Sequence, residues 1–431
     1  MDIDFIRKNP ELVAEKARQK GYPVDVLKII DLDERRRELI KRADALRNER
    51  NTLAHRPNGS KPNTEDLQRG KDLKIELNEI DLQLKEAEDE LSQALRKVPN
   101  MPLESVPVGN GEAENVVDKT VGEVPSFSFD PLSHQVIAEA LGLMDKARAA
   151  KISGSRFVYL EGDLVKLQFA IINFVMSELT NPALIERLIK ENNLNLKPKP
   201  FKPVLPPAML KTAPYQASTR LDAEETTYKL EDDDLWLNAS AEHTLCTMYM
   251  NEVIAEDELP YRLIGYSTSF RREAGSYGKD IEGILRMHQF DKIEMEVIST
   301  AATGEDEHSL LVAIQEYLVS SLGLPYQLMR KCTGDIGKPN ASGFDINTWF
   351  PSQGTYRETH TADYLTDYQT RNLRIRTRSD DGTINLAHTN DATAFALGRI
   401  LAAIIENYQD SEGHFAVPPV LIPFMAGQDK I

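Results

Sequence analysis

Cysteine is scarce in this chain of 431 residues, which contains only Cys246 and Cys332. Because the two lie far apart and show no metal-ligand spacing, we expect reduced thiols rather than a disulfide framework or a zinc site. No apolar run is long enough to span a bilayer. The N-terminal sequence MDIDFIRKNPELVAEK is charged throughout and lacks the apolar core of a signal peptide. These features predict a soluble protein of the cytoplasm with no membrane partner.

Several nucleotide- and metal-binding signatures are also missing. Gly337-Lys338 lacks an upstream glycine and precedes Pro339, so it is not a P-loop, and Gly109 and Gly111 lack the third glycine of a dinucleotide fingerprint. No H-E-x-x-H motif or Cys/His cluster points to zinc. The formal charge of −17 argues against nucleic-acid binding by bulk electrostatics but leaves room for a local basic patch.

Heptad spacing is present in the first hundred residues. Leucine recurs every seven positions at Leu32, Leu39, Leu46 and Leu53, and a regular seam resumes after a tip rich in Pro and Gly. The second seam consists of Leu73, Leu77, Ile80, Leu84, Ala87, Leu91, Ala94 and Val98. Two such helices joined by a short tip predict an antiparallel coiled-coil hairpin over residues 30–98, with arms of roughly 35–40 Å.

The first helix of this hairpin is locally basic. Its charges have two interpretations, either a solvated coiled-coil surface or a contact with an RNA backbone that reads no bases. The basic residues are Arg35, Arg36, Arg37, Lys41, Arg42, Arg47 and Arg50.

The remaining sequence divides into a short linker and a large body. Residues 106–132 are rich in Pro, Gly and acid without any periodicity, which is typical of a linker with extended segments. Residues 133–431 mix helices with separated strands and show no regular βαβ alternation. We therefore predict the α+β class, with an antiparallel sheet flanked by helices, and domains over 1–105 and 133–431.

The body contains one stretch that predicts a strand, a long loop and a returning strand, from Tyr261 to Glu294. If the strands pair, two guanidinium groups, two carboxylates and an aromatic ring converge on one surface. Such a set suits an anionic ligand with a flat base, although an ion-paired hairpin explains the same residues. The residues concerned are Arg271, Glu273, Arg286, Gln289, Phe290 and Glu294.

The string FRREAG…LRMHQFDKIE resembles the second motif of class II aminoacyl-tRNA synthetases, in the form found in seryl-tRNA synthetases. The matching positions are Phe270, Arg271, Glu273, Arg286, His288, Gln289, Phe290, Lys292 and Glu294. The N-terminal hairpin is similar to the arm with which that family holds the long variable arm of its tRNA. The resemblance covers nearly the whole chain and implies a class II catalytic domain.

Other segments resemble the same family. Residues 197–213 are weakly similar to the first motif, whose proline, here Pro206 or Pro207, lies at a dimer interface. Ser240-Ala241-Glu242 stands where Thr-Ala-Glu is usual, and LAHTNDATAFALGR resembles the third motif. Besides Ser240, five further positions depart from the family pattern, namely Asn347 for Glu, Ala362-Asp363-Tyr364 for Cys-Ser-Asn, and Asp391 for Asn. Beside a zwitterionic substrate, Asp391 has two opposite possible effects, namely stronger contact with the ammonium or repulsion of the carboxylate.

The resemblance implies activation of L-serine with ATP and transfer of serine to tRNA(Ser). It implies that Arg271 bridges the serine carboxylate and the α-phosphate, Glu273 accepts from the adenine amine and Phe290 stacks on the ring. It further implies that Arg286 holds pyrophosphate, and that Arg399 covers the other face of the ring or binds the γ-phosphate. Mg²⁺ is implied at Glu358 and Thr361. The implied serine pocket comprises Ser240, Glu242, Arg271, Glu294, Asp391 and Thr393.

The resemblance also implies a homodimer and makes Arg35, Arg36, Arg42, Arg47 and Arg50 candidates for tRNA binding. It leaves open whether selenocysteine tRNA is charged as well. Two alternatives remain, namely an amino-acid ligase that uses another acceptor and a non-catalytic dimeric paralogue. The second alternative predicts loss of the motif arginines, yet Arg271, Arg286 and Arg399 are all present.

Overall fold

The computed structural model describes residues 1–55, 63–221, 227–273 and 283–431. The chain forms two compact units, Met1–Pro102 and Leu103–Ile431. The boundary between these units lies between Pro102 and Leu103.

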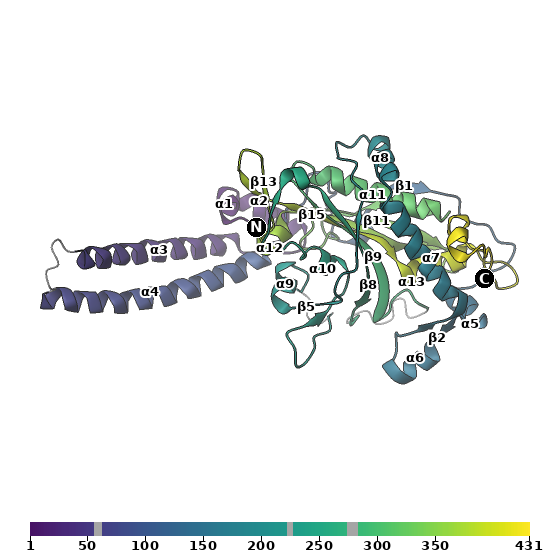
Figure 1. Ribbon diagram of the computed structural model, residues 1–431, viewed down its shortest axis with the longest axis horizontal. Coiled ribbons are helices and arrows are strands. Elements are labelled where there is room, and N and C mark those ends of the chain that lie inside the picture. The colour runs from purple at the N-terminus through teal and green to yellow at the C-terminus, as the bar shows by residue number, and fades with distance from the viewer. Residues whose placement is uncertain (56–62, 222–226, 274–282) are drawn as a thin grey trace. The chain divides into compact units, whose positions relative to one another are not determined.

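The first unit consists of helices, among them the two arms of a hairpin. Short helices α1 (Ile3–Lys8) and α2 (Pro10–Gln19) precede α3 (Val26–Ala54) and α4 (Thr64–Lys97), and the last two run side by side (Figure 1). The predicted tip lies largely outside the described residues. The seam is as the heptads predict, because its side chains are buried between the arms, including Leu39, Ala43, Leu73, Leu77, Ile80 and Ala87.

The second unit is organised around an eight-stranded sheet, which confirms the α+β prediction. Every neighbouring pair of strands is antiparallel except β4 and β8. In spatial order the strands are β1 (Val116–Val121), β10 (Tyr326–Arg330), β11 (Ser342–Phe350), β12 (Thr355–Thr366), β15 (His388–Ala396), β9 (Gln289–Ser299), β8 (Tyr261–Phe270) and β4 (Lys202–Val204).

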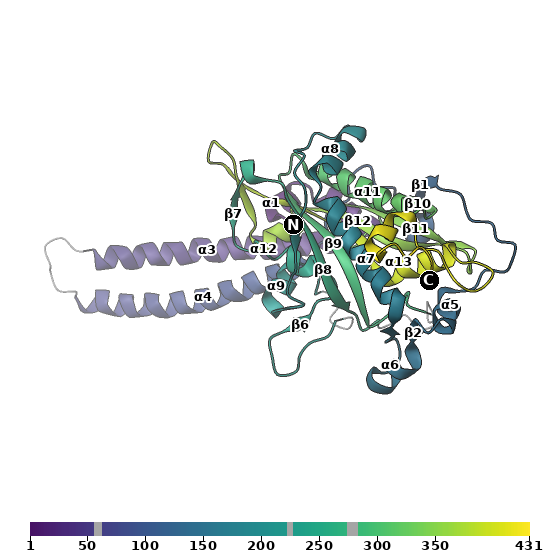
Figure 2. The ribbon, with the colours of Figure 1, turned by 45° about the vertical axis from the view of Figure 1, so that its right-hand side comes forward.

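One face of the sheet is apolar and forms the core. On β9 the alternate residues Ile293, Met295 and Val297 are fully buried on this face. Three helices pack against it and lie across the sheet in Figures 1 and 2, namely α7 (Gly162–Leu179), α11 (Gly304–Ser321) and α13 (Leu397–Asn407). Strand alternation turns the intervening residues to the opposite face, which is polar.

The stretch 106–132, expected to be a linker, contributes an element to this sheet. Strand β1 pairs with β10, and the Asn115 amide just before it donates to Asp335 Oδ2 at 2.8 Å. The six residues of β1 are mostly exposed, as befits an edge strand. Such a strand buries no continuous apolar side, so its pattern was hidden among prolines and glycines.

Smaller elements complete the second unit. They are η2 (Glu112–Glu114), α5 (His134–Ala140), β2 (Met144–Asp145), α6 (Lys146–Ser153), β3 (Tyr159–Leu160), α8 (Pro182–Glu191), β5 (Met209–Leu210), α9 (Thr212–Ala217), β6 (Trp236–Leu237), α10 (Glu242–Leu245), β7 (Val253–Ala255), η4 (Glu256–Glu258), α12 (Tyr368–Leu373), β13 (Arg376–Arg378), β14 (Ile384–Leu386) and η5 (Pro419–Met425).

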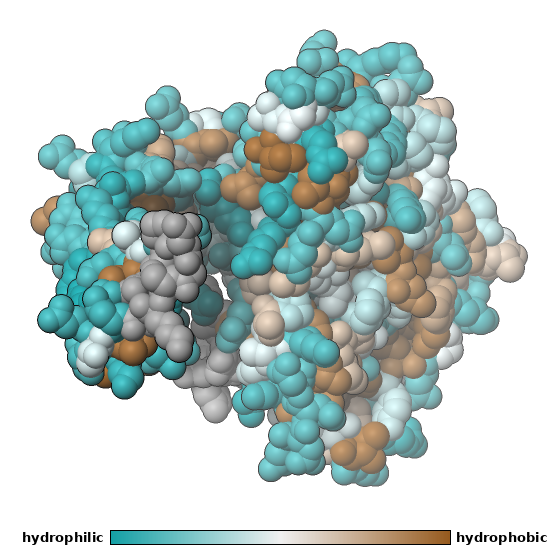
Figure 3. Space-filling view, turned by 60° about the vertical axis from the view of Figure 1, so that its left-hand side comes forward, coloured by the Kyte–Doolittle hydropathy of each residue, from teal (hydrophilic) through white to brown (hydrophobic). Residues whose placement is uncertain are grey.

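The surface is consistent with the charged composition. On the face shown in Figure 3, hydrophobic side chains gather in small groups separated by hydrophilic ones. Among the described residues, no helix combines the length and the apolar character needed to cross a bilayer.

Candidate active site

A pocket of about 500 Å³ opens on the polar face of the sheet. Strands β9, β12 and β15 supply part of its wall, together with the start of α13, helix α10 and the loop residues between β8 and β9. Arg220, Thr227 and Ala239 complete the lining. Most of the residues implied by the resemblance line it, namely Glu242, Arg271, Glu273, Arg286, Phe290, Glu358, Thr361, Thr393 and Arg399.

The β8–β9 hairpin positions the first of these groups. Its register pairs Phe270 with Gln289, so Arg271 leaves β8 beside Phe290 on β9. The Arg271 guanidinium lies 5.2 Å from the centre of the Phe290 ring, and its Nε donates to Ala239 O at 3.1 Å. The backbone of Arg271 is also tied to His288, whose carbonyl accepts from the Arg271 N–H at 2.9 Å. This arginine is therefore held before any ligand binds.

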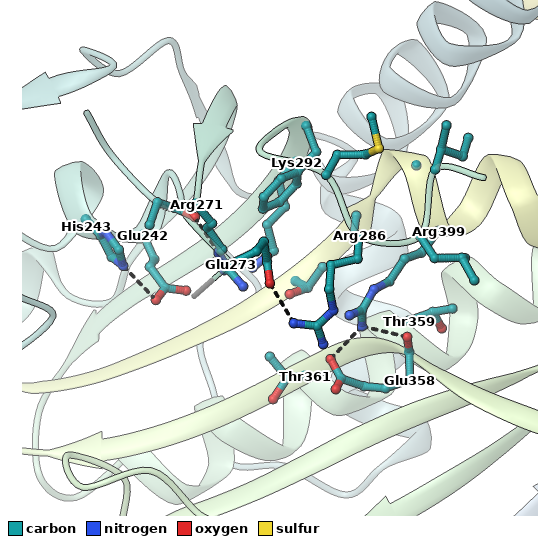
Figure 4. Close-up of a pocket in the computed structure, with 18 of the residues that line it drawn as sticks. Glu242, His243, Arg271, Glu273, Arg286, Lys292, Glu358, Thr359, Thr361 and Arg399 are labelled. Atoms are coloured by element: carbon teal, nitrogen blue, oxygen red, sulfur yellow. Dashed lines mark hydrogen bonds and ion pairs between the residues drawn. The ribbon is translucent and has the colours of Figure 1, made fainter. Parts of the chain in front are cut away.

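Two further arginines pair with carboxylates across the pocket (Figure 4). Arg286 Nη1 donates to Glu273 Oε2 at 2.6 Å. Arg399 Nη1 donates to the backbone oxygen of Glu358 at 2.7 Å and to its Oε1 at 2.9 Å. Desolvation in the pocket opposes ionisation of Glu358, but Arg399 and Lys331 together outweigh it and hold the pKa of this carboxyl below its ordinary value. The three pocket arginines of the motifs are thus gathered around one space, as the resemblance implies.

The residues assigned to serine lie at one end of the pocket. Ser240 Oγ donates to Glu294 Oε1 at 2.9 Å, and Lys292 forms a close ion pair with the same carboxylate. Thr393 on β15 stands directly opposite Glu294 on β9. Ser240 and Glu294 are fully buried and lie behind the residues that line the pocket.

The pKa values of Glu242 and Glu294 are shifted in opposite directions. Burial opposes ionisation of Glu242, but Arg220 and His243 outweigh it, so the pKa of this carboxyl lies well below its ordinary value. For Glu294, burial outweighs the opposing effect of Lys292 and raises the pKa. An ionised Glu242 suits an ammonium ligand, whereas a buried Glu294 that shares bonds with Ser240 suits a hydroxyl.

Asp391 lies in a row of acids beneath the pocket. The sheet register places Asp363 opposite Asp391, and Asp391 opposite Glu296, and all three are buried. Burial raises the pKa of Asp391 and of Glu296 well above the ordinary values, and Arg220 opposes both shifts. Arg220 forms a close ion pair with Asp391, so a cation from another part of the chain reaches this residue.

The candidate metal ligands have the expected chemistry. The carboxylate of Glu358 and the hydroxyl of Thr361 are hard oxygen donors on one strand, and both line the pocket. Thr361 Oγ1 also accepts a bond from Lys331 Nζ at 3.3 Å. The donor set fits Mg²⁺ that keeps part of its coordination for phosphate oxygens and water.

The candidate tRNA arginines lie on α3 of the first unit. Arg35 pairs with Glu90 at 3.2 Å, Arg36 with buried Asp33 at 2.7 Å, and Arg47 with Asp81 at 2.9 Å. Arg42 and Arg50 are exposed. Three of the five thus contact acids of the hairpin itself.

Sequence reasoning missed two residues that hold this pocket. Arg220 belongs to no recognised motif, and its partner Asp391 is 171 positions away. His134 lies at the start of α5, where Nε2 accepts from the Ile284 N–H at 3.3 Å and the ring contacts Glu406 at 2.7 Å through Nδ1. Neither residue gives a local signal, because its role depends on a fold that brings distant segments together.

Comparisons with known proteins cover both units. Residues 1–102 match the family described as seryl-tRNA synthetase N-terminal domain, and residues 227–408 match the tRNA synthetase class II core domain (G, H, P, S and T). The serine–tRNA ligase of Deinococcus radiodurans is 37% identical over 439 residues, covering 100% of this chain and 99% of that protein.

Two solved structures are also similar. The seryl-tRNA synthetase of Pyrococcus horikoshii, complexed with ATP, is 34% identical with a TM-score of 0.89, covering 100% of this chain and 99% of that one. The cytoplasmic serine–tRNA ligase of Naegleria fowleri, in complex with AMP, is 27% identical with a TM-score of 0.84, covering 100% of this chain and 98% of that one.

Proposed function

The chain belongs to the seryl-tRNA synthetase family, and from this premise we propose how its residues activate L-serine with ATP and hold tRNA(Ser). The observation that carries the proposal is the pocket itself, in which Arg271 stacks on Phe290 while Arg286 and Arg399 face the same space. The relatives solved with ATP and with AMP support nucleotide binding by this chain.

In the first step, a serine carboxylate oxygen forms a bond to the α-phosphorus of ATP. The bond from that phosphorus to the bridging oxygen breaks, and pyrophosphate leaves with the electron pair. The nucleophile is already an anion, so no strong base is needed, and positioning and charge stabilisation supply the rate. Arg271 bridges the carboxylate and the α-phosphate, Arg286 binds the leaving pyrophosphate, and Arg399 binds the γ-phosphate or covers the adenine ring.

The base and the metal are held from the same walls. Phe290 stacks on adenine and Glu273 accepts from its exocyclic amine. Mg²⁺ bound by Glu358 and Thr361 would neutralise charge on the phosphates. These two residues orient their oxygens toward the pocket from β12, which also positions Thr359 beside them.

Serine is selected by its ammonium and its hydroxyl. Glu242 and Ser240 bind the ammonium, while Glu294 and Thr393 bind the hydroxyl. Glu294 Oε1 is already bonded by Ser240 and Lys292, but alanine would leave its buried Oε2 without a partner. Sites that lose such a bond reject the analogue by roughly 10⁴–10⁵-fold. In the second step the seryl group passes to a hydroxyl of the terminal adenosine of tRNA, and the adenylate leaves as AMP.

The tRNA and assembly assignments belong to the same proposal. The α3–α4 hairpin offers Arg42 and Arg50 on its exposed surface, with Arg35, Arg36 and Arg47 beside them. A homodimer through the segment around Pro206 and Pro207 is supported by the neighbouring Leu205, whose relative exposure is 82%. Light scattering on purified protein tests the dimer, and a monomer at micromolar concentration refutes it. Two buried free cysteines are consistent with action in the cytoplasm.

ATP–pyrophosphate exchange tests the function. We expect exchange with serine alone among the amino acids, followed by charging when tRNA(Ser) is supplied as acceptor; selenocysteine tRNA in a parallel reaction shows whether it is charged as well. Exchange without charging would indicate another acceptor, and folded protein that is silent with every amino acid would indicate a non-catalytic paralogue.

The variant Arg271→Ala tests the assigned chemistry. It should lower the exchange rate by about 10²–10³-fold, because a charge that stabilises the transition state is lost. Arg272→Ala is the matched control, since Arg272 is exposed and faces the Tyr228 ring at 5.6 Å instead of Phe290. Equal rates for the two variants would contradict the role given to Arg271.

A further inference from the structure

Arg220 lies at the serine end of the pocket without belonging to any motif of the family. It follows α9 in the chain and lines the pocket with Glu242. Its Nη2 pairs closely with Asp391 Oδ2, and its Nε lies 3.4 Å from Glu242 Oε1. The side chain of Arg220 is 16% exposed and that of Asp391 is 2% exposed. One buried guanidinium therefore connects two carboxylates that come from separate elements.

The need for this cation follows from the sheet register. Asp391 stands between Asp363 and Glu296 on neighbouring strands, and like charges directly opposite one another destabilise a sheet. Asp363 has its own partner, because Lys331 Nζ lies 3.5 Å from its Oδ1. In the part of the chain that the structure describes, Arg220 is the basic residue found in ion-pair contact with Asp391. A buried carboxylate that loses such a partner is strongly destabilised.

Position then links this pair to the substrate. Asp391 and Thr393 are two residues apart on β15, so both side chains point to the same face of the sheet. An unpaired Asp391 would compete with Glu242 for the serine ammonium. An ion pair with Arg220 would remove this competition.

We propose that Arg220 is a positioning residue of the amino-acid subsite, which neutralises Asp391 and orients Glu242 so that the serine ammonium meets one carboxylate in a fixed place. The inference rests on the proposed serine subsite. It predicts that Arg220 and Asp391 act as a unit, and that their loss affects the binding of serine and leaves the binding of ATP nearly unchanged.

The experiment measures the KM values of L-serine and ATP by pyrophosphate exchange for the full-length variants Arg220→Met, Asp391→Asn and Arg220→Met/Asp391→Asn. Arg220→Met should raise the serine KM at least about tenfold, because it leaves two buried carboxylates without their partner, and change the ATP KM less than about threefold. The double variant should have a lower serine KM than Arg220→Met alone, although it carries one more substitution, because a neutral amide at position 391 needs no counter-charge.

Controls separate this role from a general effect on folding. Arg220→Lys keeps the charge and should lie closer to wild type than Arg220→Met does, which also keeps the test valid if the methionine variant does not fold. Arg330→Met removes an arginine from a partly exposed pair with Asp118, outside the pocket, and should leave both KM values unchanged.

Three results would overturn the inference, namely an unchanged serine KM in Arg220→Met, a parallel rise of both KM values, or a double variant whose loss equals the product of the single losses. Wild-type protein without serine-dependent exchange would instead refute the proposed function.

Discussion

Gly283 allows the returning end of the β8–β9 loop to approach His134. Its φ of +66° lies in the left-handed region, and a Cβ at this position would stand 1.7 Å from His134 Nε2. That nitrogen accepts the backbone N–H of Ile284 at 3.3 Å, and Nδ1 of the same ring lies 2.7 Å from Glu406 Oε1. The substitution Gly283→Ala must therefore displace a buried histidine.

The cost of this substitution follows from two effects. A non-glycine residue in the left-handed region costs roughly 1–2 kcal/mol. A displaced His134 leaves the Ile284 N–H unsatisfied, which costs a further 1–3 kcal/mol or so. We therefore expect the free energy of unfolding to fall by about 2–5 kcal/mol in total, and by less if the pocket wall shifts to relieve the contact. Because Ile284, Leu285 and Arg286 line the pocket, the ATP KM should rise together with the loss of stability.

The assay compares Gly283→Ala with Gly142→Ala in thermal unfolding and in ATP–pyrophosphate exchange. Gly142 has a φ of +68° and no atom within 4 Å of an added Cβ, so it isolates the backbone effect. In a His134→Ala background, the added cost of Gly283→Ala should fall to that of Gly142→Ala. Equal effects of the two glycine substitutions in the wild-type background would refute the reasoning, because the contact with His134 would then have no cost.

Two further predictions concern pH and tRNA. Although burial opposes ionisation of Glu406, bonds from His134 and Ser352 lower its pKa below the usual 4.5. This group therefore stabilises the fold above pH 4.5 and loses that contribution as the pH falls through the lower folded pKa. Glu406→Gln should flatten the fall in unfolding free energy between about pH 5 and pH 3, and an unchanged slope would contradict this prediction. Deletion of residues 32–98 should spare serine-dependent exchange and reduce tRNA charging at least about a hundredfold, because the phosphate contacts of the arm are lost. Equal charging by the truncated protein would refute the arm assignment.

The parts of the fold that the sequence predicts well are those with a periodic pattern or a local motif. The heptads between Leu32 and Val98 depend only on spacing along one helix, and the β8–β9 hairpin depends on residues close in sequence. Strand β1 was missed because its six residues pair at an exposed edge, where no alternation is required.

The pocket shows the same division. Arg271, Glu273, Arg286 and Phe290 could be placed together because they share one hairpin, and the structure brings them to one pocket. Arg220 could not be found in this way. A surface arginine and a buried counter-ion look alike in a sequence, and only the sheet register shows why an acid at position 391 needs a cation.

The pairing of pocket arginines with carboxylates explains how a chain with a formal charge of −17 can hold a polyanion. Before ATP binds, Arg286 pairs with Glu273 and Arg399 with Glu358. Neither guanidinium therefore has to move from bulk water into the pocket when the ligand binds. In the proposed binding mode ATP would supply a partner for both members of the first pair, since phosphate oxygens would accept from Arg286 while the adenine amine would donate to Glu273. An anion without a base can bind Arg286 in place of Glu273, but it offers no donor to Glu273 and leaves that carboxylate unpaired. The internal ion pairs therefore favour a complete nucleotide over simple phosphates, and this selectivity comes from local pairing rather than from the net charge of the protein.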